Sequence, residues 1–181
     1  MIDSSKNSEI KILVNMATIT VGGGVQASIT FIEYLINNRS KLFNCKFILV
    51  MTKDLIKYLN IDNLDFKIFI IKNSPSHPFK GFLSRKMLLE IENNCNPDII
   101  YSIGFPSYVK FKNLEIARYT NPFEICDYSV AFQQLNIFEK IKRKILIFYR
   151  LYYAKKADFF VTQTNHAREG IINKLKINKS K

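Results

Sequence analysis

Short apolar runs rich in β-branched and aromatic residues recur along the chain, separated by longer segments in which apolar residues return every three or four positions. The runs are nearly continuous rather than alternating with polar residues, which is typical of strands buried on both faces of a parallel sheet. They predict six strands, at residues 10–16, 46–51, 66–71, 98–102, 116–120 and 157–163.

The periodic segments predict five helices, at residues 25–37, 54–59, 82–94, 133–156 and 164–174. Thr52 is expected to cap the second helix, and Thr164 or Asn165 the last. In each helix, the apolar residues that share one face are expected to pack into the core. In the first and third helices these residues are Ile29, Ile32, Leu35, Ile36, Leu83, Met87, Leu88 and Ile91. In the long fourth helix they are Phe138, Ile141, Ile145, Phe148 and Tyr152.

The alternation of strands and helices predicts an α/β fold with a doubly wound, mostly parallel sheet of the Rossmann-like type. Helices on both faces make this a three-layer α/β/α arrangement. We expect one domain over residues 10–176, a disordered tail at residues 1–9 and a tail or the start of a linker at residues 177–181. Ligands bind such sheets beyond the carboxyl ends of the strands, so function is expected in the turns that follow them.

Three consecutive glycines, Gly22, Gly23 and Gly24, stand between the first predicted strand and the first predicted helix. With Ala27 they match the form G-x-G-x-x-A of the dinucleotide fingerprint, but five residues separate them from the strand and no acidic residue closes the second strand. The Lys and Ser/Thr of a Walker loop are also missing. Two interpretations stay open: a tight turn without a ligand, or backbone that lets a phosphate or sugar approach a helix N-terminus.

Composition restricts the partners and the location. The 181 residues include 27 basic and 15 acidic residues, and the net charge of +12 favours an anionic partner. Nucleic acid is not the expected partner, because no helix-turn-helix, zinc or RNA-recognition signature accompanies the charge. The two histidines have no clustered carboxylates or thiols, so no metal site is expected. Scattered cysteines and a start without a signal-peptide core predict a cytoplasmic protein.

The predicted long helix is strongly basic from Glu139 to Lys156, with seven basic residues and one acidic residue. Tyr149 and Tyr153 extend onto a second, mixed face beside the basic residues. A basic and aromatic helix of this kind can lie on an anionic bilayer, here the inner face of the membrane. An ordinary crossover helix with a solvated basic side has the same pattern, and both interpretations stay open.

Three stretches together resemble the N-terminal domain of GT-B-fold glycosyltransferases of the group-1, family-4-like type. In chain order they are KILVNMATITVGGGVQASITFIEYLINN, NPDIIYSIGFPSYVKFKNLEIARYTNPFEI and YRLYYAKKADFFVTQTNHAREGI. In that family they correspond to the first strand with its glycine loop and long helix, to the fourth and fifth strands, and to a basic helix followed by a strand and a Thr- or Ser-led final helix. The similarity covers nearly the whole chain.

The resemblance implies the acceptor-side domain of an enzyme that moves a sugar from a nucleotide-sugar to a hydroxyl of a glycan or lipid-linked acceptor, in bacterial-type surface polysaccharide assembly. The nucleotide-sugar is a co-substrate, and no further cofactor is implied. The glycines Gly22, Gly23 and Gly24 would lie near the donor phosphates and the reacting sugar. The other substrate contacts implied by the resemblance are Ser102, Gly104, Ser107, Gln163 and Thr164.

Asn121 and Glu124 are the candidate catalytic residues that the resemblance implies after the fifth strand. Many relatives carry His or Asp there, whereas the amide of Asn121 can hydrogen-bond a sugar hydroxyl but cannot act as a general base. A turn before Pro122 is the alternative role for Asn121, and a solvated loop charge is the alternative for Glu124.

The chain ends at Lys181, about where the linker to the donor domain of such enzymes begins. We therefore expect the chain to need a donor-domain partner and to transfer no sugar alone. A non-catalytic Rossmann-like binding module that serves a partner chain is the alternative.

Overall fold

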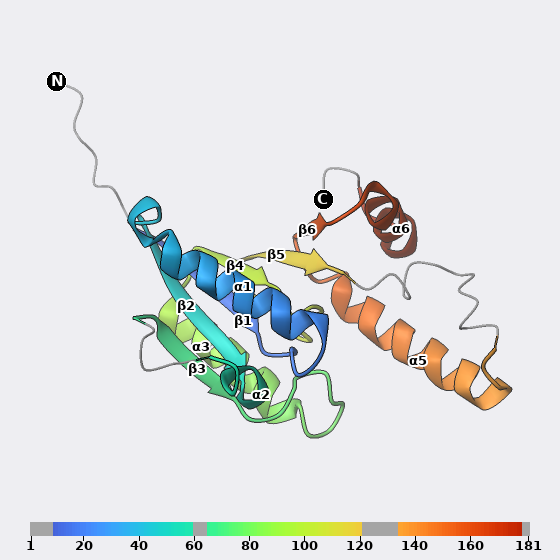
Figure 1. The fold of residues 1–181 in the computed structure, drawn as a ribbon. Coiled ribbons are helices and arrows are strands. Elements are labelled where there is room, and N and C mark those ends of the chain that lie inside the picture. The colour runs from blue at the N-terminus through green and yellow to red at the C-terminus, as the bar shows by residue number, and fades with distance from the viewer. Residues whose placement is uncertain (1–8, 60–64, 121–133, 179–181) are drawn as a thin grey trace.

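Six parallel strands form one sheet in the order β3-β2-β1-β4-β5-β6 (Figure 1). The computed structural model describes residues 9–59, 65–120 and 134–178. The strands are β1 (Ile10–Met16), β2 (Cys45–Thr52), β3 (Lys67–Ile71), β4 (Ile99–Ser102), β5 (Leu114–Tyr119) and β6 (Phe159–Thr162). The helices are α1 (Gly23–Asn37), α2 (Lys53–Ile56), α3 (Phe82–Cys95), α5 (Ile137–Ala154) and α6 (Asn165–Leu175), with a 3₁₀ turn η1 (Arg39–Lys41). The doubly wound parallel α/β fold is confirmed, and each predicted strand lies within two residues of an observed one.

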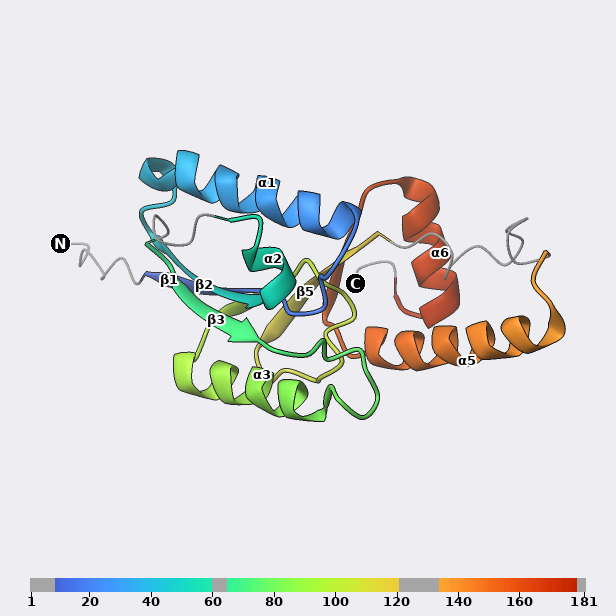
Figure 2. The ribbon, with the colours of Figure 1, turned by 60° about the horizontal axis from the view of Figure 1, so that its bottom comes forward.

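The sheet lies between two helical layers, so the three-layer arrangement is also confirmed (Figure 2). α1 and α2 cover one face, and α3 and α5 lie on the other. The topology explains this division. Right-handed crossovers from β1 to β2 and from β2 to β3 run in one direction across the sheet, while the later crossovers run in the opposite direction. No described helix covers β6 on the α1 side, and Phe159 and Val161 are exposed there.

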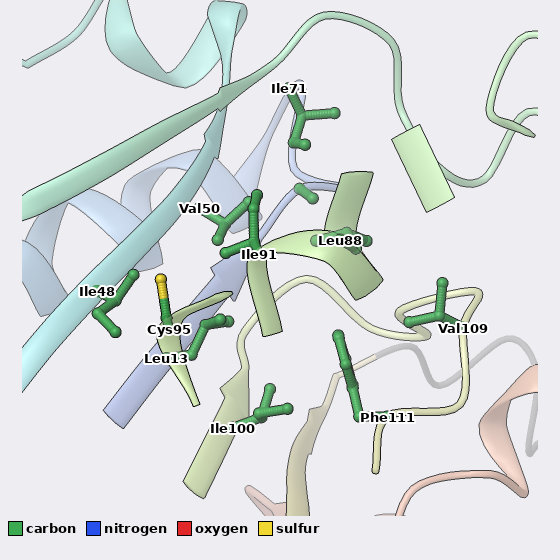
Figure 3. Close-up of a cluster of buried hydrophobic side chains, with 11 residues drawn as sticks. Leu13, Ile48, Val50, Ile71, Leu88, Ile91, Cys95, Ile100, Val109 and Phe111 are labelled. Carbon is green, nitrogen blue, oxygen red and sulfur yellow. The ribbon is translucent and has the colours of Figure 1, made fainter. Parts of the chain in front are cut away.

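A separate apolar core fills each side of the sheet. Figure 3 shows the core under α3, where Leu88, Ile91 and Cys95 pack against side chains of β1, β2, β3 and β4. The core on the other face joins α1 and α2 to alternate residues of the same strands. Because successive strand residues point to opposite faces, a strand covered on both faces must be apolar at nearly every position. This is the physical reason why the continuous apolar runs predicted the strands.

The predicted inward faces of α1 and α3 are only partly correct. Ile36 and Leu83 were expected in the core, but both are exposed. The other predicted members are buried or pack at the edge of a core, namely Ile29, Ile32, Leu35, Met87, Leu88 and Ile91. Both helices carry more apolar residues than one stripe holds. The angle at which a helix crosses the sheet therefore determines which of the neighbouring apolar residues faces inward. That angle cannot be read from the spacing of apolar residues in the helix sequence.

The start of α5 follows from a capping box that the apolar period did not reveal. The Asn136 side chain accepts a hydrogen bond from the Glu139 backbone N–H at 2.9 Å, and the Glu139 carboxylate accepts one from the Asn136 backbone N–H at 3.1 Å. These two bonds satisfy N–H groups that a helix otherwise leaves unpaired at its N-terminus. The helix therefore begins at Ile137 rather than at residue 133 as predicted.

The predicted core face of α5 is wrong. Its five apolar residues are between 51% and 84% exposed, namely Phe138, Ile141, Ile145, Phe148 and Tyr152. The helix is held by its tyrosine face instead. The buried ring of Tyr108, in the connection between β4 and β5, lies 5.5 Å from the ring of Tyr149 and 5.3 Å from that of Tyr153. Ala154 is buried in a third apolar cluster with Ile171 of α6. Both faces of α5 contain large apolar or aromatic residues, and contacts with residues distant in sequence determine which of the two is buried.

Candidate ligand site beside the glycine corner

The glycine corner lies at the carboxyl end of β1, where the fold places ligand sites. Gly22 is the N-cap of α1, with φ 71° and ψ −151°, a conformation essentially restricted to glycine. No side chain caps α1, and its first turn holds no acidic residue. The Val25 N–H bonds the Gly22 carbonyl at 3.0 Å. The first N–H groups of α1 therefore have no side-chain acceptor, and the partial positive charge of the helix end is not neutralised locally.

The three glycines have different surroundings. Gly22 is required by its backbone conformation. A Cβ on Gly24 would touch the Ile19 side chain at 3.4 Å, so Gly24 allows the loop and the helix to pack closely. A Cβ on Gly23 would meet no atom within 4 Å, and neither a turn nor packing requires glycine at this position. A Cβ on Gly22 would likewise meet no atom within 4 Å, but of the three glycines it is Gly23 that lines the cleft beside the sheet.

A cleft of about 580 Å³ runs from Gly23 back along α1, between that helix and strands β4 and β5. Its wall on the sheet includes Tyr101 and Arg118, and its wall on the helix is mostly apolar or aromatic. The rings of Phe31 and Tyr101 contact each other within its lining, with their centres 5.5 Å apart. The complete lining is Gly23, Gln26, Ala27, Thr30, Phe31, Tyr34, Tyr101, Ile103 and Arg118. A mostly apolar cleft with a few convergent polar groups is the usual form of a small-molecule site.

Arg118 is the charged group of this cleft. It is half-buried on β5, and no described residue forms an ion pair or hydrogen bond with its guanidinium. Burial raises the pKa of the neighbouring Tyr101, and the charge of Arg118 partly opposes that rise. A half-buried cation beside a free helix N-terminus favours an anionic ligand. The sequence interpretation missed Arg118, although a basic residue inside a strand predicted to be buried was a signal that could have revealed it.

A buried polar network lies under the opposite face of the same strands. The Asn15 amide donates to the Ser102 hydroxyl at 3.2 Å, and that hydroxyl donates to the Glu115 carboxylate at 2.6 Å. All three side chains are buried. Burial is the main cause that raises the pKa of Glu115, while hydrogen bonds from Ser102 and Ser107 partly offset it. The network joins β1, β4 and β5 just before the loops that border the cleft, so it supports the site from inside.

Replacing Glu115 by glutamine is expected to alter how stability depends on pH. Because its folded pKa is raised, the contribution of Glu115 is fully present below the ordinary glutamate value of 4.5 and is lost as the pH rises through the folded value. The wild-type protein should therefore lose stability relative to Glu115→Gln as the pH rises from about 4.5. Urea unfolding of both proteins at a series of pH values from there upward measures the difference. A difference that stays constant with pH would contradict this prediction.

The substrate contacts predicted after β4 lie in a packed loop. The Ser102 and Ser107 side chains are buried and bond Glu115 in this structure. The Gly104 N–H bonds the Asn15 carbonyl at 3.2 Å, and a Cβ on Gly104 would lie 2.5 Å from the Thr18 hydroxyl. The residue types in this loop are therefore explained by packing against the β1 loop, and contact with a substrate stays a prediction for all three.

The predicted substrate contacts after β6 do not line the cleft along α1. Thr164 caps α6 as expected, because its hydroxyl accepts a hydrogen bond from the Ala167 N–H at 3.1 Å. Gln163 is exposed beside it, and neither residue lines the cleft along α1. Asn121 and Glu124, the candidate catalytic residues, lie outside the described residues. Their roles stay predictions.

A second cavity of about 410 Å³ lies at the amino ends of the strands. It is lined by residues that include Arg39 and Asp65, which form an exposed ion pair. This edge of a parallel sheet is opposite to the one at which such folds bind their ligands. The cleft beside Gly23 is therefore the stronger candidate.

Comparison with known proteins supports the fold. No protein-family model matches the chain, and no curated protein sequence matches it. A solved structure with a similar fold belongs to a protein assigned as a UDP-N-acetylglucosamine 2-epimerase from Listeria monocytogenes. The TM-score is 0.57 at 14% sequence identity, and the match covers 95% of this chain and 43% of the other. The likeness supports a GT-B-like Rossmann fold, and this chain spans less than half the length of that protein.

Proposed function

We propose that this chain is the acceptor-side half of a GT-B-fold glycosyltransferase that uses a nucleotide-sugar in the assembly of surface polysaccharide or lipid-linked glycan. The observation that carries the proposal is one cleft that joins Gly23, at the free N-terminus of α1, to the Arg118 guanidinium. The fold it shares with an enzyme whose name specifies a UDP-sugar supports the same class of substrate.

The cleft has the chemistry to hold the leaving group of a sugar transfer. When the acceptor hydroxyl attacks the anomeric carbon, the bond to the diphosphate breaks and negative charge grows on the departing phosphate. The N–H groups at the start of α1 and the Arg118 cation would stabilise that charge. The rings of Phe31, Tyr34 and Tyr101 would provide an apolar wall for the sugar or the base.

The acceptor hydroxyl must also lose its proton during the transfer. We assign this step to Glu124, because a carboxylate can accept a proton and the amide of Asn121 cannot. Asn121 would orient the hydroxyl by a hydrogen bond. In a test for each role, Glu124→Gln in the completed enzyme should lower kcat by at least about 100-fold, whereas Asn121→Ala should mainly raise the acceptor KM.

Binding of a nucleotide-sugar by the isolated chain tests the cleft directly. UDP-N-acetylglucosamine titrated into the ¹⁵N-labelled protein should shift the amide signals of Gly23 and Gly24, with weak affinity because the other half of the enzyme is absent. Arg118→Ala should weaken this binding by about tenfold or more, since it removes a charge-assisted contact. Arg39→Ala, at the opposite edge of the sheet, is the matched control and should leave the affinity unchanged. Equal affinity for wild type and Arg118→Ala would refute the assignment.

Turnover separates the half-enzyme from a binding module. The purified chain alone should show no detectable transfer from UDP- or GDP-sugars, and a supplied donor-domain chain should restore transfer. Transfer by the isolated chain would contradict the proposal. Sugar binding that no donor-domain chain converts into turnover would favour the non-catalytic module instead.

A further inference from the structure

α5 carries an exposed apolar stripe along almost its whole length. At 3.6 residues per turn, the stripe residues fall within an arc of about 100° on the helix. They are Ile137, Phe138, Ile141, Ile145, Phe148 and Tyr152, and each is more than half exposed. An ordinary crossover helix buries such a stripe against its sheet, whereas α5 buries Ala154 and leaves this stripe, here called the α5 stripe, uncovered.

The fold holds the α5 stripe away from the domain. Tyr149 and Tyr153, which follow one edge of the stripe on the helical projection, pack against Tyr108, and Ala154 packs against α6 from the far side of the helix. In Figures 1 and 2 the N-terminal part of α5 projects well beyond the sheet. These contacts hold α5 through residues outside the stripe, and the stripe itself stays exposed.

Basic residues border the stripe on both sides. On the same helical projection Lys142 lies beyond one edge, and Lys140 and Lys144 lie beyond the other. Two more lysines follow the end of the helix, and the Lys156 ammonium lies 4.7 Å from the centre of the Tyr152 ring. The one acidic residue of the segment, Glu139, uses its carboxylate in the capping box.

We propose that the α5 stripe inserts into the interface of an anionic lipid bilayer, with α5 lying parallel to the membrane surface. An apolar stripe meets the acyl boundary while lysines on both flanks meet the phosphate plane, which is the arrangement of interfacial amphipathic helices. A protein partner would have to supply acidic groups along both flanks, whereas an anionic membrane supplies them everywhere at once. α5 would lie on the bilayer, because every helix in the described part of the chain is too short or too polar to cross one.

This inference does not depend on sugar transfer. Its evidence is the exposure and charge of α5, and the cleft beside Gly23 takes no part in it. The Arg118→Ala variant should lose nucleotide-sugar binding and keep membrane binding. Variants of the α5 stripe should lose membrane binding and keep nucleotide-sugar binding.

Vesicle binding by the 181-residue protein is the test. The protein should cosediment with vesicles that contain phosphatidylglycerol and bind pure phosphatidylcholine vesicles at least about tenfold more weakly. The double variant Ile145→Ser with Phe148→Ser should lose tenfold or more of the binding to anionic vesicles. The charge variant Lys142→Glu with Lys144→Glu should lose as much. All four residues are exposed, so the domain is expected to keep its fold, which circular dichroism checks.

Control variants carry comparable chemical changes elsewhere on the surface. Phe43→Ser with Tyr58→Ser removes two equally exposed aromatic side chains, and Lys41→Glu with Lys46→Glu reverses two charges at the amino edge of the sheet. Both controls should bind anionic vesicles like the wild type.

The wild-type chain contains no tryptophan, so the fluorescence of one introduced tryptophan reports insertion directly. Phe148→Trp should show a shift of its emission to shorter wavelength with anionic vesicles, and Phe43→Trp should show none. Two results would overturn the proposal: no binding to anionic vesicles, or binding that the stripe variants leave intact. If the protein does not bind vesicles and forms a dimer that depends on Ile145 and Phe148, the stripe is an interface between two copies instead.

Discussion

Replacing Gly81 by alanine is expected to lower the free energy of unfolding by about 3 kcal/mol, because the added methyl group has no space. Its Cβ would stand 2.5 Å from the His77 carbonyl oxygen, 2.7 Å from that of Pro75 and 2.8 Å from that of Ser74. These are backbone atoms, so no rotamer change relieves the clash. The loop is also held in place, since the Arg85 guanidinium donates to the carbonyls of Pro75 at 2.7 Å, His77 at 3.2 Å and Pro78 at 2.7 Å.

Gly23→Ala is the matched control for this substitution. Gly23 also lies at the start of a long helix, but a Cβ there meets nothing within 4 Å. The control should change stability by less than about 1 kcal/mol, since alanine also reduces the entropy of the unfolded chain. Urea unfolding followed by circular dichroism compares the two variants. An equal loss in both would show that the carbonyl cage around Gly81 is not what makes glycine necessary there.

The second large effect is expected from Ser102→Ala, which should cost about 2–4 kcal/mol. The Ser102 hydroxyl is the shared member of the buried network, since it accepts from the Asn15 amide and donates to Glu115. Alanine would leave both partners buried without this contact. An unsatisfied buried donor or acceptor loses its interaction with water and gains nothing in return, which is why the cost exceeds that of an ordinary hydrogen bond.

Ser28→Ala provides the comparison within the same protein. Ser28 is fully buried in α1, and its hydroxyl donates at 2.9 Å to the Gly24 carbonyl in the preceding turn. That carbonyl also accepts a backbone hydrogen bond within the helix, so alanine leaves no polar group without a partner. The free energy of unfolding is therefore expected to change by less than about 1 kcal/mol. Thermal or urea unfolding of both variants decides the matter. If Ser28→Ala were as costly as Ser102→Ala, the volume of the side chain rather than the network would explain the loss.

The sequence predicted the part of the candidate site that is local. Gly22 to Gly24 were predicted between the first strand and the first helix, and the pattern left both a ligand and a plain turn open. Gly22 is the N-cap of α1, whereas Gly23 and Gly24 are the first two residues of the helix. The structure separated the three glycines by conformation and packing. Arg118 was not found, because its role depends on a cleft formed with a helix more than eighty residues earlier in the chain.

The buried network was hidden from the sequence for a related reason. Asn15 and Ser102 are 87 residues apart, and Ser102 and Glu115 lie on neighbouring strands. Each looks like an isolated polar residue in an apolar run. Ser102 and Ser107 were interpreted as ligand contacts on the basis of a family resemblance, and in the folded protein both hydroxyls bond Glu115.

The sequence by itself determined the six strands, their parallel arrangement and the capping of α2 and α6, because continuous apolar runs and cap side chains act through the nearest few residues. Only the tertiary structure decided which face of α5 is buried. Both faces carry large apolar or aromatic side chains, and the choice was made by Tyr108 and by α6, which approach from elsewhere in the chain. A periodic pattern shows that a helix has an apolar face. Whether the core or another partner covers that face depends on how the rest of the chain folds around the helix.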